Sequence, residues 1–134
     1  LQSVLNLKIN YDLLPFKYQT TFEKVTDATI LATIGIQVQN KDLTYQEENG
    51  SILTTVRIFG RVTDSLGRVW ESFEAEMRPE VPKPFLKEVT GGASYFQKTI
   101  PLKAGQYRLE LALKELNSEN IGTLYQSLVV TDQK

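Results

Sequence analysis

Residues 101–113 read PLKAGQYRLELAL, and they alternate apolar and polar side chains after a turn at Gly105. Successive side chains of a β-strand point to opposite faces of the sheet, so this alternation is typical of a strand with one buried face. Glutamate, lysine and leucine also favour helices, but the strict period of two and the glycine favour a strand. The apolar face carries Tyr107, Leu109, Leu111 and Leu113.

The same alternation recurs along most of the chain, and no segment shows the 3.6-residue period of an amphipathic helix. Short strands separated by turns, without helices between them, predict an all-β protein. We expect an immunoglobulin-like or fibronectin-like antiparallel β-sandwich of about seven strands. Besides the stretch quoted above, the alternation predicts strands near residues 5–11, 30–38, 52–63, 68–77, 96–100 and 124–130.

Polar turns connect the predicted strands. Asp64-Ser65-Leu66-Gly67 predicts a hairpin turn, with the glycine available for a left-handed position. Residues 117–122 form a longer turn between the last two strands. Residues 79–93 contain three prolines and two glycines, so we expect them to form the main irregular connection.

The centres of the alternating strands predict the core between the two sheets. Tyr107 stands two residues after Gly105, where immunoglobulin-like sandwiches place a tyrosine whose hydroxyl bonds back to the backbone. The alternative is an ordinary core tyrosine with its hydroxyl at the rim. The residues that we expect at the centre of the core are Ile34, Ile36, Ile58, Leu109 and Leu111.

Composition excludes several classes of function. The chain of 134 residues has the size of a single domain over residues 1–134, which we expect to be excised from a longer protein. It contains no cysteine and no histidine, so disulfides, thiolate or imidazole catalysis and metals bound by sulfur or imidazole are excluded. The net charge of −1 comes without any basic run, so no nucleic acid partner is expected. No cofactor, metal site or membrane insertion is expected.

Carboxylates are the stronger of the remaining candidates for catalysis; Ser-Lys pairs such as Ser94 with Lys98 also remain, although such proximity arises by chance in any polar chain. Glu74 and Glu76 share one face of a predicted strand, and Glu47 and Glu48 lie on a polar loop tip. A pair of carboxylates serves glycosidases as acid and base or nucleophile. The alternative is that these acids face solvent and only keep the protein soluble, so we predict no catalytic residue.

Aromatic residues near the N-terminus suggest a surface for interaction. The stretch over residues 13–22 is too apolar for a free loop, and Pro15 cannot donate to the ladder of a central strand. Phe16, Tyr18 and Phe22 either form an exposed aromatic contact surface or close one open end of the sandwich.

Trp70 is the fourth candidate residue for an interaction surface. In the alternation of its strand it occupies one of the polar positions, so it either faces outward or packs under the 79–93 connection. If the chain is a carbohydrate-binding module, an exposed aromatic platform must exist. Trp70, Tyr45, Tyr95 and Tyr125 are the plausible contributors to such a platform.

Several segments together resemble one bacterial family. They are YDLLPFK at 11–17, QVQNKDLTYQEENG at 37–50, IFGRVTDSLGRVWESFE at 58–74 and PLKAGQYRLELALKELNSENIGT at 101–123. In the same order, these segments resemble the carboxy-terminal β-sandwich domain of the GWxTD-domain proteins of acidobacteria and related phyla. The Gly-Trp-x-Thr-Asp motif itself is absent, and the single tryptophan lies in RVWES. The resemblance implies a sandwich in an exported protein, periplasmic or at the cell surface, and it implies no catalytic residue.

We therefore expect a non-catalytic accessory or interaction domain of an exported bacterial protein, with a carbohydrate-binding module or a carboxylate-dependent hydrolase as alternatives. Its expected partners are other domains of the parent chain or another protein. The first predicted strand carries one charge, Lys8, in LNLKIN and contains no proline. Because unprotected edge strands pair with neighbours, we also expect weak self-association through residues 3–10.

Overall fold

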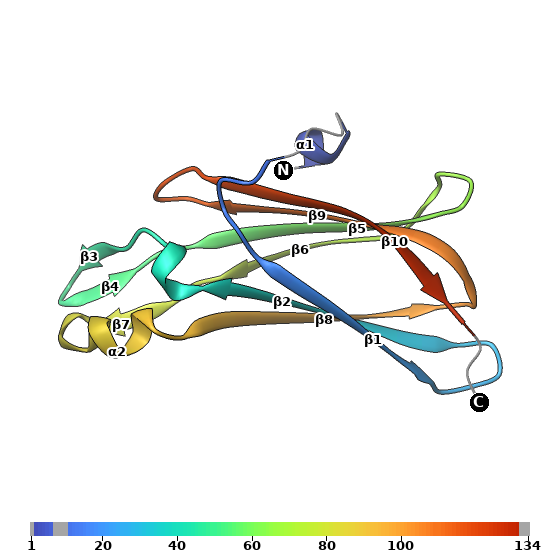
Figure 1. The fold of residues 1–134 in the computed structure, drawn as a ribbon, viewed down its shortest axis with the longest axis horizontal. Helices are drawn as coiled ribbons and strands as arrows, with labels where there is room; N and C mark the ends of the chain where they lie inside the picture. Colours follow the sequence, from blue (N-terminus) through green and yellow to red (C-terminus); the bar gives the residue numbers. More distant parts are fainter. Residues whose placement is uncertain (1, 7–10, 132–134) are drawn as a thin grey trace.

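The computed structural model describes residues 2–6 and 11–131, and in this part of the chain two antiparallel sheets pack face to face (Figure 1). The first sheet has the order β1-β2-β8, with bounds Lys17–Lys24, Ile30–Gln39 and Ala93–Leu102. The second has the order β10-β9-β5-β6, with bounds Ile121–Val130, Gly105–Glu115, Val56–Asp64 and Val69–Met77. The prediction of an all-β antiparallel sandwich is confirmed.

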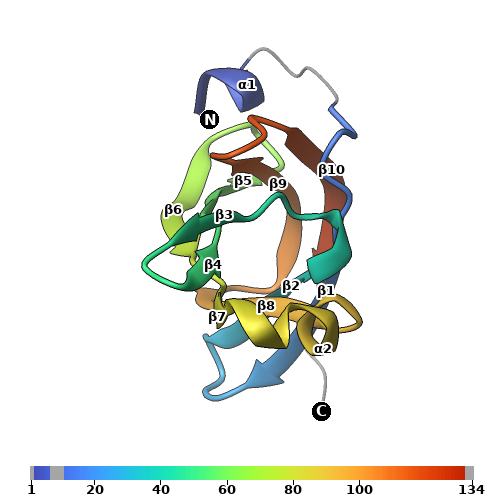
Figure 2. The same ribbon diagram turned by 90° about the vertical axis from the view of Figure 1, so that its left-hand side faces the viewer.

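A small third sheet and short helices gather at one end of the sandwich (Figures 1 and 2). The prolines and glycines of the 79–93 connection limit its regular elements to single turns and a three-residue strand. The sheet has the order β3-β4-β7, with bounds Gln46–Glu48, Ser51–Leu53 and Glu80–Pro82. The helical segments there are η1, η2 and α2, with bounds Asn40–Asp42, Lys83–Phe85 and Leu86–Thr90.

The core lies between the two large sheets, as the alternation predicts. In β2, every second side chain is buried from one end of the strand to the other. The five residues predicted at the centre of the core are each at most 1% exposed, which confirms the strand parity. They are Ile34, Ile36, Ile58, Leu109 and Leu111.

Both predicted hairpins are confirmed. The Asp64 carboxylate closes the β5–β6 turn by accepting the backbone N–H groups of Leu66 and Arg68, each at 2.9 Å. The hydrogen bond from the Arg68 N–H is the main cause that lowers the pKa of Asp64 below its ordinary value. Gly67 has φ of +81°, the left-handed conformation that glycine adopts without strain. The second hairpin joins β9 and β10 through the turn at 117–122.

The prediction of a strand at the N-terminus is wrong over Gln2–Asn6, which form helix α1. The predicted edge strand over residues 3–10 is therefore absent there, and residues 7–10 lie outside the described part. Helix α1 lies on the outer face of the four-stranded sheet (Figure 1), where Leu5 is fully buried with Phe59 and Ala112. Burial of one leucine against an apolar patch overrides the local preference for a strand, because tertiary contacts outweigh propensity.

The chain then crosses from one sheet to the other (Figure 1). Asp12 forms a bridge with Gly122 at the start of β10, and the Leu14 N–H donates to the Ile121 carbonyl at 3.2 Å. Pro15 follows at the crossing, before β1 pairs with β2 on the opposite sheet. A side chain at Gly122 would overlap the Leu14 carbonyl oxygen, so the crossing needs a glycine there.

Tyr107 forms the predicted tyrosine corner. Its hydroxyl donates to the Lys103 carbonyl oxygen at 2.8 Å, four residues upstream, and its ring is buried in the core. This hydrogen bond ties the start of β9 to the residue that directly follows β8. The prediction of a tyrosine corner is confirmed.

Replacing Tyr107 with phenylalanine removes this bond while the ring stays in place. We expect the free energy of unfolding to fall by about 1 kcal/mol, the typical net value of one such hydrogen bond. Urea denaturation of both proteins measures the difference, with Tyr95→Phe as a control because Tyr95 is 71% exposed. Equal losses in the two variants would contradict a special role for the corner.

Candidate functional site

Three of the four residues predicted for an interaction surface support the core. Phe16, Tyr18 and Phe22 are half-buried and pack against the main apolar cluster. In β1 the half-buried side chains alternate with exposed ones, because the strand lies at the edge of its sheet with one face inward. These aromatic rings therefore cover one side of the core.

Trp70 lies elsewhere, at the start of β6. The pairing of β5 with β6 shifts between Val62 and Thr63, so that Trp70 is an extra residue on its strand. Such a bulge changes the face to which a side chain points. The indole N–H donates to the Pro101 carbonyl oxygen in β8 at 3.1 Å, and the ring meets Tyr107 edge-on at 5.8 Å between centroids. Trp70 thus links the two sheets and remains 41% exposed.

The other candidates for an aromatic platform differ in exposure. Tyr45 is half-buried against the main core. Tyr125 is half-buried beside Leu5, and its hydroxyl lies 3.5 Å from the Val4 carbonyl oxygen. Tyr95 is 71% exposed on β8 and is the candidate that presents most of its ring to solvent.

The paired glutamates lie on the outer face of β6. Glu74 and Glu76 line an open hollow of about 700 Å³, together with Arg57 and Lys114 from neighbouring strands. Both glutamates are exposed, and Glu76 lies 3.4 Å from the Arg57 guanidinium. A glycosidase acid must hold a proton near neutral pH, which burial in an apolar site provides. The surroundings of these two acids do not supply such burial.

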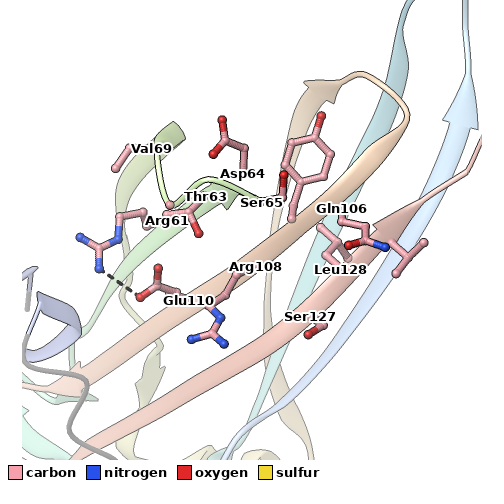
Figure 3. A pocket seen from close by; sticks show the side chains of 13 residues that line it. Arg61, Thr63, Asp64, Ser65, Val69, Gln106, Arg108, Glu110, Ser127 and Leu128 are labelled. Atoms are coloured by element: carbon pink, nitrogen blue, oxygen red, sulfur yellow. Dashed lines mark hydrogen bonds and ion pairs between the residues drawn. The ribbon is translucent and has the colours of Figure 1, made fainter.

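A second hollow of about 660 Å³ lies on the same outer face, beside the β5–β6 turn (Figure 3). Arg61 and Glu110 form an ion pair in it at 3.0 Å, and both side chains are almost completely buried. Arg108, Thr63 and Ser127 add a guanidinium and two hydroxyl groups. The hollow therefore contains hydrogen-bond donors and acceptors, and its lining includes both positively and negatively charged side chains.

Sequence reasoning missed the Arg61–Glu110 pair. Both residues have the outward parity of their strands, which predicts solvent exposure. The register places them directly opposite each other on β5 and β9. Such a pair can be predicted when opposite charges occupy facing positions of neighbouring strands. That prediction requires the strand order, which the sequence alone does not provide.

A buried carboxylate, Glu115, holds three loops together at the end of β9. It is fully buried and accepts the Thr44 backbone N–H at 2.6 Å and the Thr54 hydroxyl at 2.8 Å. Its second oxygen accepts the Ser118 hydroxyl at 2.7 Å. Glu115 occupies the next inward position after the alternating series from Tyr107 to Leu113. A carboxylate at such a core position is the feature of the sequence that could have identified this buried group.

Tyr45 lies close to Glu115. Burial raises the pKa of the Tyr45 hydroxyl above its ordinary value of 10.0, and the negative charge of Glu115 raises it further. The hydroxyl has no hydrogen-bond partner among the described residues. A raised pKa means that the folded state favours the neutral phenol, so this contribution to stability is present below pH 10 and is lost as the pH rises further.

We expect Tyr45→Phe to change the free energy of unfolding at pH 7 by less than about 1 kcal/mol, because the hydroxyl removed has no protein partner. Above pH 10 the variant should lose less stability than the wild type, since it has no phenol to ionise. Urea denaturation across pH 7–11 measures both effects. Parallel pH profiles for the two proteins would contradict the assignment.

Two structural findings complete the description of the site. Among residues 2–6 and 11–131, no three carboxylate, histidine or cysteine side chains gather in an arrangement that could hold a metal ion. In the same residues, no helix has the length and apolar character needed to cross a membrane.

Known structures share the fold. No protein-family model matches the sequence, and a search of curated proteins finds no match. A β-glucuronidase from Bacteroides uniformis matches with 13% identity and a TM-score of 0.58, over 84% of this chain and 13% of that chain. A putative β-galactosidase from Bacteroides fragilis matches with 15% identity and a TM-score of 0.58, over 84% of this chain and 16% of that chain.

A smaller protein also matches over its whole length. The putative ApaA protein from Bordetella pertussis shows 11% identity and a TM-score of 0.53, over 92% of this chain and 98% of that chain. At these identities the likeness concerns the fold alone. This chain spans only 13% of the β-glucuronidase and 16% of the β-galactosidase, so it is similar to one part of those enzymes.

Proposed function

We propose that this chain is a non-catalytic accessory domain of a longer, exported bacterial protein. The observation that carries the proposal is the position of its carboxylates. Glu110 and Glu115 are buried and bonded to Arg61 and to loop donors, whereas Glu74 and Glu76 are exposed beside basic side chains. None of these four glutamates has the combination of access and apolar burial that an acid catalyst requires.

The structural matches support the same proposal. The sandwich is similar to a small part of each of two enzymes that act on glycosides, which is the place of an accessory domain. The resemblance of the sequence to the appended sandwich of GWxTD-domain proteins is the basis for proposing export and a bacterial parent chain. The partner in this proposal is a neighbouring domain of that chain.

A hydrolase assay tests the proposal. Wild-type protein is incubated with aryl glycosides and with polysaccharides, and released phenol and reducing ends are measured. We expect no release above the buffer blank. Release by the wild type that is lost in Glu74→Gln or Glu76→Gln would establish the carboxylate-dependent hydrolase instead. Glu23→Gln is the matched control, because Glu23 is another exposed glutamate but lies on β1, outside both candidate pairs of carboxylates.

A further inference from the structure

The outer face of the three-stranded sheet carries amides and hydroxyls where most surfaces carry charges. The register aligns its outward side chains in rows across β1, β2 and β8. Three adjacent rows hold one charged side chain, Lys17, and the next row begins with Glu23. Ordinary soluble surfaces mix lysine, arginine, aspartate and glutamate, so a nearly uncharged polar face is a specific feature. The three rows are Lys17–Gln37–Tyr95, Gln19–Gly35–Gln97 and Thr21–Thr33–Thr99, and we call them the amide face.

The centre of the amide face is hollow because Gly35 has no side chain. A hollow of about 410 Å³ lies over it, lined by residues of all three strands. Gln19 on β1 and Gln97 on β8 lie on either side of Gly35 on β2. Two strand spacings separate them, so their backbones are about 10 Å apart. The hollow is thus a short channel with the Gly35 backbone at its base and the amide side chains of Gln19 and Gln97 on its two sides.

Packing does not explain the glycine at this position. A Cβ atom added at Gly35 would meet only the Gln19 carbonyl oxygen, at an ordinary contact distance of 3.7 Å. At Gly60 and Gly122, by contrast, an added Cβ would overlap Phe73 or Leu14. Glycine in a strand interior costs about 0.5–1 kcal/mol relative to alanine, and it often marks a place where a ligand approaches the backbone.

Tyr95 stands beside this hollow, one row away from Gly35 on β8. Its side chain is 71% exposed, which is the largest exposure of any aromatic side chain among the described residues. An aromatic ring offers a flat apolar face, and a sugar ring has an apolar face of C–H groups that packs on it. An exposed tyrosine beside a polar channel is therefore suited to a sugar.

The amides complete this chemistry. A glutamine side chain both donates and accepts hydrogen bonds, as sugar hydroxyls do. Gln19, Gln37 and Gln97 all line the hollow, and Lys17 is the charged side chain among its described lining residues. An anionic ligand would need a cluster of cations, and the described lining has one charged side chain. Tyr18, Ile36 and Phe96 add apolar surface, which suits the C–H faces of a sugar ring.

We propose that the amide face binds an uncharged glycan chain, with one sugar ring stacked on Tyr95 and its neighbour in the channel over Gly35. The amides of Gln19 and Gln97 bond to the hydroxyls of the ring in the channel. This inference rests on the proposed function as an accessory domain and names the ligand class of that domain.

Isothermal titration calorimetry with cellohexaose, xylohexaose, mannohexaose and laminarihexaose tests the site. We expect at least one of these uncharged oligosaccharides to bind. Tyr95→Ala should weaken that binding about tenfold or more, because it removes the stacked ring. Gly35→Gln should abolish it by filling the channel, and this variant should fold because there is room for the new Cβ.

Phe85→Ala is the matched control, since Phe85 is 54% exposed but lies in η2, outside the amide face. Binding should be unchanged in it. The site is overturned if none of the four hexaoses binds, if Tyr95→Ala and Gly35→Gln both bind as the wild type does, or if anionic polygalacturonate binds more tightly than every hexaose. Release of shorter sugars during the titration would contradict the non-catalytic function, whereas absence of binding without release would leave that function standing.

Discussion

Replacing Glu115 with alanine is expected to lower the free energy of unfolding by about 3–5 kcal/mol. The carboxylate is the acceptor for the Thr44 N–H and for the hydroxyls of Thr54 and Ser118. Thr54 is itself fully buried, so its hydroxyl cannot turn to water when the acceptor is removed. Each buried donor left without an acceptor costs about 1–3 kcal/mol, and the smaller side chain leaves a cavity as well.

Urea denaturation of the wild type and of Glu115→Ala measures this loss. Glu76→Ala is the control, because Glu76 is an exposed acid in a surface ion pair with Arg57. Such pairs contribute about 1 kcal/mol or less. A loss in Glu115→Ala as small as in Glu76→Ala would show that the carboxylate does not hold the loops together.

The second large effect is expected at Gly60. Gly60 lies opposite Phe73 in the pairing of β5 with β6, and the Phe73 ring lies directly over it. A methyl group at Gly60 would overlap three atoms of that ring. Because Phe73 in turn stacks on Phe96 of the other sheet, at 6.3 Å between centroids, the ring has little room to move. Gly60→Ala should therefore cost about 2–3 kcal/mol, as overpacked cores do.

Gly35→Ala is the matched control for this prediction. It is the same substitution in a central strand, but the added Cβ meets no side chain. We expect it to be neutral or to stabilise the protein by up to about 1 kcal/mol, since alanine has less freedom in the unfolded state. Thermal unfolding of the two variants compares them directly. Equal melting temperatures would contradict the assigned role of Gly60.

The sequence predicted the sandwich well because most strands have one buried face. In β2 and β9 the inward side chains follow a period of two without interruption at the centre of the strand. This period can be read directly from the sequence. The N-terminus differs because α1 buries one leucine, Leu5, on an outer face that no local pattern describes. A contact between distant segments decides that helix.

The candidate sites depend more strongly on distant contacts. The bulge in β6 reverses the direction of Trp70, and nothing in RVWES indicates it. The Arg61–Glu110 pair and the amide face both arise from strands that are far apart in the sequence. Tyr95 is a candidate for an aromatic platform because it is a tyrosine, but its position beside Gly35 follows only from the strand order β1-β2-β8.

The most direct test of a non-catalytic, glycan-binding accessory domain is an NMR titration of isotope-labelled protein with the hexaose that binds best. The expected result is that backbone amide shifts change on β1, β2 and β8, largest near Gly35 and Tyr95, while the sugar's anomeric signals stay constant for days. Shift changes centred on Glu74 and Glu76, together with new reducing-end signals, would contradict it.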